Sequence, residues 1–149
     1  MVNGTINVTL NPGIYTITGG GITFNGTGTI TGTGVTLYIR SSGGSVTLNG
    51  TQAFNLTAPT TGSYAGILFY QDPSNTSGAT INGTQTSKFE GGLYFPSAQL
   101  TLNGTGSTQV YFISVAKSYL LNGTGTLNFP SNYAGLPGGS PIKDAILVE

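Results

Sequence analysis

Few side chains in this sequence can do acid–base chemistry. The 149 residues include four acidic and four basic side chains, and neither histidine nor cysteine. Asp72 and Glu90 are the carboxylates in the central part of the chain, and their predicted places on adjacent coils would allow them to approach each other. Polysaccharide lyases and hydrolases need paired carboxylates, or a carboxylate-bound metal with a basic residue. Solubilising surface charge is the simpler interpretation, so we predict no catalytic residues and no enzyme.

No residue pattern predicts a metal or a cofactor. Histidine and cysteine, the commonest transition-metal ligands, are missing. Calcium needs several oxygen ligands, usually carboxylates, and no aspartate recurs at a fixed period. A net charge of zero gives no basic surface for nucleic acid. No apolar run approaches the ~20 residues of a membrane segment.

The motif Asn-Gly-Thr organises the chain. Successive copies lie 22, 24, 33, 21 and 19 residues apart, with the asparagines at Asn3, Asn25, Asn49, Asn82, Asn103 and Asn122. A period of roughly 20 residues is typical of stacked repeats. We predict an all-β chain, a single right-handed parallel β-helix (β-solenoid) of about five to six coils over residues 1–129, with three short strands in each coil. Asparagine and glycine tolerate positive φ, which favours a sharp bend, and stacked asparagines predict an amide ladder.

Apolar and polar residues alternate before each motif. The residues one and three positions before the asparagine are mostly apolar and are expected to face the interior. The residue between them is threonine in four repeats, which predicts an outward column of Thr23, Thr47, Thr80 and Thr101. Such an array resembles the ice-binding faces of some β-solenoids, but threonine is also simply a favourable exposed strand residue.

A second strand is expected to precede each motif, centred on a tyrosine with mostly apolar neighbours. Because the neighbours should face inward, the tyrosines predict an outward stripe of Tyr15, Tyr38, Tyr70, Tyr94 and Tyr111. Aromatic rings in such a stripe can stack on sugars or bury in a partner surface. They can equally pack on one another and cover the neighbouring backbone.

The long gap after Asn49 indicates insertions. Residues 58–64 and 72–78 are rich in turn-forming residues, and we expect both to leave the coil as loops. Residues 130–149 break the repeat and are interpreted as a cap over the last coil. Among nine Asn-x-Ser/Thr sequences, Asn75 alone lies on a predicted loop, so it is the one candidate for glycosylation.

Residues 10–17, 64–72, 92–97 and 136–142 resemble the C-terminal region of TadG-like proteins, which are associated with Tad/Flp pilus assembly in bacteria. The resemblance covers nearly the whole chain. It implies an extracellular or cell-envelope location and a membrane-anchored N-terminal segment. Because Met1 lies directly on a repeat, we expect this sequence to be a piece of a longer chain. Family members often carry cysteine here, and the resemblance brings no catalytic residues.

Three functional hypotheses remain open. The first is a non-catalytic scaffold at the cell surface or envelope, associated with pilus-type assembly, whose partners are other envelope or pilus proteins or a second copy stacked end to end. The second is a binding module that uses the threonine array for ice or the tyrosine stripe for glycans. The third is a polysaccharide lyase or hydrolase.

Overall fold

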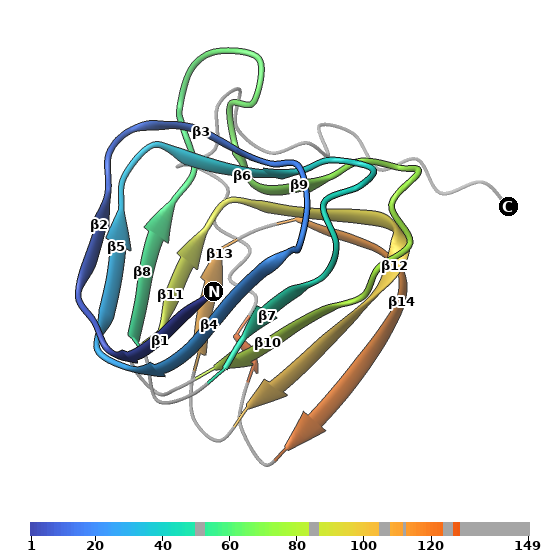
Figure 1. Ribbon diagram of the computed structural model, residues 1–149. Helices are drawn as coiled ribbons and strands as arrows, with labels where there is room; N and C mark the ends of the chain where they lie inside the picture. Colours follow the sequence, from blue (N-terminus) through green and yellow to red (C-terminus); the bar gives the residue numbers. More distant parts are fainter. Residues whose placement is uncertain (50–52, 84–86, 105–107, 112, 124–126, 129–149) are drawn as a thin grey trace, which may run out of the picture.

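The computed structural model describes residues 1–49, 53–83, 87–104, 108–111, 113–123 and 127–128. These residues form parallel strands that stack as a β-solenoid of about five turns (Figure 1). No helix occurs in this part of the chain. The predicted all-β parallel solenoid is therefore confirmed.

The first three coils each contain three short strands, as predicted. They are β1 (Val2–Thr5), β2 (Val8–Leu10) and β3 (Gly13–Ile17), then β4 (Ile22–Thr27), β5 (Thr29–Gly32) and β6 (Val35–Ile39), then β7 (Val46–Leu48), β8 (Ala53–Thr57) and β9 (Ile67–Gln71).

The later coils merge two of these strands into one. Their elements are β10 (Ala79–Gly83), β11 (Lys88–Glu90), β12 (Gly92–Gly104), β13 (Thr108–Tyr111), β14 (Ser114–Gly123) and β15 (Leu127–Asn128). In the pairing of β12 with β14, the register shifts between Phe95 and Gln99, where the chain passes from one face to the next. The prediction of three separate strands per coil is wrong here, because an irregularity replaces the turn.

The strands make three faces, which Figure 1 shows obliquely along the stack. The asparagine face consists of β1, β4, β7 and β10 with residues 99–104 of β12 and 118–123 of β14. The tyrosine face consists of β3, β6 and β9 with residues 92–95 and 114–116. The third face consists of β2, β5, β8, β11, β13 and β15.

Apolar columns fill the space between the faces. Phe54 lies between Phe24 and Phe89, with ring centroids 6.1 and 5.5 Å apart. On the tyrosine face, Phe69 lies 6.1 Å from Phe95. In the central coils the inward residues of all three faces are buried, as the alternation predicts. Burial of this apolar surface is the main force that holds the coils together.

The glycine of the repeated motif is required by close stacking of backbone. Gly26 has a φ of 141°, and a Cβ at this position would lie 2.1 Å from the carbonyl oxygen of Gly4 in the coil below. Gly123 meets Gly104 in the same way. Every positive φ in the described residues belongs to a glycine, so the asparagines contribute no such bend, contrary to the expectation.

The insertion in the third coil is concentrated in one loop. Nine residues, 58–66, join β8 to β9, whereas two residues join β5 to β6. This loop projects from the tyrosine face in Figure 1. Residues 72–78 are only one residue longer than the equivalent link 40–45 and fold into the corner, so they do not leave the coil as predicted. The predicted cap at 130–149 lies outside the described residues.

Replacing Gly26 with alanine tests the close backbone contact. We expect the free energy of unfolding to fall by about 2–4 kcal/mol, because the methyl group combines a disfavoured φ with a clash against Gly4. Denaturant unfolding measures the change. Gly19→Ala is the matched control, since nothing lies within 4 Å of its added methyl group, and it should stay within about 0.5 kcal/mol of the original. Equal stability of the two variants would contradict the stacking geometry.

Candidate binding surfaces

The asparagine column consists of Asn25, Asn49, Asn82, Asn103 and Asn122, which lie one above another. Asn49 Nδ2 donates to Asn25 Oδ1 at 3.0 Å, and Asn82 donates to Asn49. Asn103 donates to Asn82 at 2.6 Å, and Asn122 donates to Asn103 at 3.1 Å. All four bonds therefore run in the same direction along the stack.

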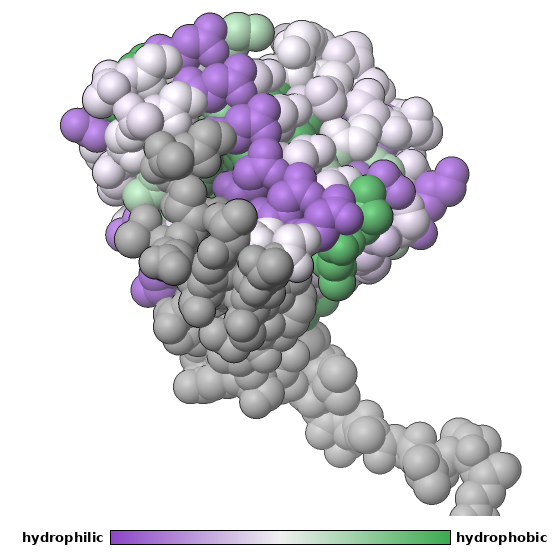
Figure 2. All heavy atoms as spheres, turned by 90° about the horizontal axis from the view of Figure 1, so that it is seen from below, coloured by the Kyte–Doolittle hydropathy of each residue, from purple (hydrophilic) through white to green (hydrophobic). Residues whose placement is uncertain are grey.

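Asn3 lies in register with Asn25 but makes a different contact. Its side-chain amide donates to Met1 Sδ at 3.1 Å. The side chains of the column are half-buried or exposed on the outer side of the asparagine face. In Figure 2 they form a continuous hydrophilic row with paler residues beside it.

The threonine array lies beside this column. Thr23 is in register with Thr47, Thr47 with Thr80, and Thr80 with Thr101, and all four side chains are half-buried on the outer side of the sheet. Leu120 takes the next position of the same column in β14. On the other side of the asparagines, the hydroxyls of Thr5 and Thr27 lie 2.7 Å apart.

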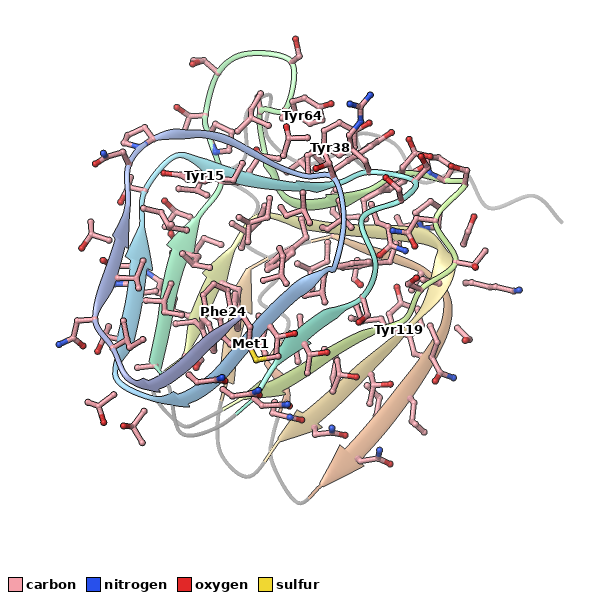
Figure 3. All side chains as sticks on the ribbon, in the orientation of Figure 1. Met1, Tyr15, Phe24, Tyr38, Tyr64 and Tyr119 are labelled. Carbon is pink, nitrogen blue, oxygen red and sulfur yellow. The ribbon has the colours of Figure 1, made fainter. Side chains whose placement is uncertain are left out.

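Three of the predicted stripe tyrosines form a cluster with a fourth from the inserted loop. Tyr38, Tyr70 and Tyr94 are in register on the tyrosine face, and Tyr70 and Tyr94 are stacked with centroids 5.1 Å apart. Tyr64 of loop 58–66 lies 5.9 Å from Tyr38 and 5.5 Å from Tyr70. Figure 3 shows Tyr38 and Tyr64 together outside the ribbon.

The rings of the tyrosine cluster pack mainly on one another. Burial, and then the neighbouring phenols Tyr94, Tyr64 and Tyr38, raise the pKa of Tyr70 above its ordinary value. A stacked or edge-on neighbour covers the ring faces that a sugar would need. The cluster therefore attaches loop 58–66 to the body of the solenoid.

Two predicted members of the stripe lie elsewhere. Tyr15 pairs with Leu37 instead of Tyr38, so it points to the core, and its hydroxyl donates to Asn11 O at 3.0 Å (Figure 3). Its neighbour Ile14 is 53% exposed. A shift of one residue exchanges the two sides of a strand, which explains this reversal. Tyr111 belongs to β13 on the third face, where it pairs with Glu90.

The two central carboxylates do not approach each other. Glu90 lies on the third face and forms an ion pair with Lys88 at 2.7 Å. Glu90 lies near the first end of β9, because Gly92 pairs with Ile67, whereas Asp72 follows the last residue of that strand. The five residues of β9 therefore separate the two carboxylates by roughly 16 Å. The Ser74 hydroxyl at 2.5 Å and the Ser74 amide at 2.9 Å hold the pKa of Asp72 below its ordinary value.

Gln71 and Asn75 form a buried polar group that the sequence patterns did not predict. Gln71 occupies an interior position opposite Ile39, and its Nε2 donates to Asn75 O at 2.7 Å and Ser77 O at 3.0 Å. Gln71 Oε1 is buried without a hydrogen-bond partner among the described residues. Gln71 was visible in the sequence as a polar residue in an apolar column.

Asn75 is unsuitable for the glycosylation that the sequence suggested. Asn75 is only 2% exposed, and its side-chain Nδ2 donates to Arg40 O at 2.9 Å and to Gly44 O at 3.2 Å. A glycan on this nitrogen would require the corner to open. Through these two bonds, residues 72–78 instead connect their own corner to the equivalent corner 40–45 of the preceding coil.

Other kinds of site find no support in the part of the chain that the structure describes. Its residues contain no group of three or more side chains that could hold a metal ion. No helix there is long and apolar enough to span a bilayer. Comparisons with protein-family models, curated proteins and solved structures return no match.

Replacing Gln71 with leucine tests the buried corner. Two carbonyl groups lose their donor while the unpaired Oε1 is also removed, so we expect a net loss of about 1–3 kcal/mol in unfolding free energy. Cleavage of residues 72–78 by a protease should become faster. Thr76→Ala, at an exposed position of the same loop, is the control. A leucine variant as stable and as resistant as the control would show that the amide bonds contribute nothing.

Proposed function

We propose that this chain is a non-catalytic structural module of the cell surface or envelope, associated with pilus-type assembly. The single observation that supports this best is the unbroken stack of paired coils around one apolar core. Each coil of such a stack contacts only its neighbours, so the chain is a linear element that presents its faces and its loop along one axis. The location and the pilus association rest on the resemblance to TadG-like proteins.

The arrangement of charged groups favours scaffolding over polysaccharide cleavage. Glycosidases hold two carboxyl groups about 5–9.5 Å apart, and one of them keeps a raised pKa to act as the acid. Asp72 and Glu90 are much farther apart, Glu90 is paired with Lys88, and the pKa of Asp72 is lowered. These features are those of surface carboxylates.

End-to-end association of two copies is part of this proposal. Leu121 and Tyr119 continue the interior columns of Leu102 and Leu100, yet they are 58% and 47% exposed. In the first coil, Val8 and Leu10 are only half-buried. Because the four bonds of the asparagine column all point toward the preceding coil, Asn122 Oδ1 is oriented to accept from the Asn3 amide of a second copy. The contact would repeat the pairing that joins the coils within one chain.

Deletion in the cells from which the chain derives tests the pilus association. We expect removal of residues 1–149 to reduce the number of assembled pili. The double variant Asp72→Asn/Glu90→Gln should assemble pili normally, because neither carboxylate has a catalytic role. Electron microscopy of intact cells gives the count. Normal piliation after the deletion would refute the association, and a defect in the double variant would refute the non-catalytic role.

Light scattering across a concentration series tests end-to-end association. The apparent mass should rise with concentration, and Leu121→Lys should keep the chain monomeric because it places a charge on the exposed end of an interior column. Ser118→Lys is the control, since this outward position in the same strand lies away from the contact. A strict monomer at every concentration, or equal effects of the two lysines, would remove this part of the proposal.

A further inference from the structure

The asparagine face is regular in two directions. Its strands pair residue for residue from β1 to β14, and the register shifts of the sheet lie outside residues 99–104 and 118–123. Neighbouring coils are about 4.8 Å apart, and outward residues two positions apart along a strand are separated by about 6.6 Å. Side chains on this face therefore lie on a two-dimensional lattice.

The lattice points of the central coils carry small uncharged groups, whereas Leu120 takes the threonine position in β14. The threonines 23, 47, 80 and 101 supply hydroxyl and methyl groups, and the adjacent asparagines supply amides. An amide has two N–H donors and two lone pairs on its oxygen. The bonds of the column use one donor and one lone pair of Asn49, Asn82 and Asn103, so a second donor and a second lone pair remain for solvent.

The asparagine face also lacks charged side chains and the residue types that are common in protein–protein interfaces. The strand segments that form it contain no aspartate, glutamate, lysine or arginine. Tyrosine, tryptophan and arginine dominate protein-binding hot spots, and they are missing from the described outward positions of this face. A neutral, repeating surface fits these properties best.

The polar groups are held in place before any ligand arrives. The amides are fixed by one another, and the backbone of each strand is paired with its neighbours on the stack. A surface that is already ordered loses little conformational entropy when it binds. A flexible ligand would still lose its own conformational entropy on such a surface, whereas the molecules of a crystal lattice are already ordered.

We propose that the threonine array and the asparagine column together bind the surface of ice. Ice presents water oxygens in a flat lattice with repeats of the same order as those of this face. The hydroxyl and amide groups replace hydrogen bonds of surface water, while the methyl groups occupy the spaces between them. This binding requires no charge and no partner protein, and it does not depend on the proposed scaffold function.

Inhibition of ice recrystallisation by the purified chain tests the proposal. The original protein should slow crystal growth and shape single crystals. The double variant Thr47→Tyr/Thr80→Tyr should need at least about tenfold more protein for the same effect, because two rings hold the threonines and asparagines away from the ice lattice. Both positions point outward and tyrosine suits strands, so the variant should fold. Its circular dichroism and melting temperature check this.

Thr31→Tyr is the matched control, because Thr31 is an outward, half-buried threonine on the third face, in register with Thr9. It should inhibit recrystallisation as well as the original protein. The proposal is overturned if the original protein leaves crystal growth unchanged, or if Thr31→Tyr loses as much as the double variant. Retention on crystalline cellulose or chitin without any effect on ice would also overturn it, in favour of a polysaccharide ligand.

Discussion

Residue-for-residue pairing between successive coils is the constraint on which the rest of this structure depends. Each strand takes its hydrogen-bond partners from the coils before and after it, so one register fixes the core columns and the outer columns together. The third coil shows how strictly the register is kept. Its 33-residue separation from the next motif still leaves Thr47 opposite Thr80, because the extra residues are accommodated in loop 58–66.

Much of the fold could be predicted from the sequence because each motif marks one coil. The asparagines set the register, and the alternation before them correctly separates the buried Leu48 and Leu100 from the outward Thr47 and Thr101. The tyrosine strands have no such marker, and their distance to the next motif varies. The predictions that Tyr15 points outward and that Tyr111 lies on the tyrosine face are therefore wrong. Tyr38, Tyr70 and Tyr94 do align, as predicted.

Local sequence also fails where contacts join distant segments. Nothing near Tyr64 indicates that its ring packs on Tyr38 and Tyr70, and the turn-rich composition of 72–78 does not reveal the amide bonds of Gln71 and Asn75. Both features attach irregular chain to a regular frame. The frame can then present a polar, uncharged face on one side and an anchored loop on another, so that different surfaces are available for different roles.

The most direct measurement of the central claim is the set of nuclear Overhauser contacts between side-chain amides in solution. Residue-for-residue stacking predicts cross-peaks from the Asn49 amide to both Asn25 and Asn82, which are far apart in the sequence. It also predicts contacts between the backbones of Thr47 and Thr80. Cross-peaks that indicate antiparallel neighbours, or asparagines paired with residues outside their column, would contradict the stacked solenoid and every surface derived from it.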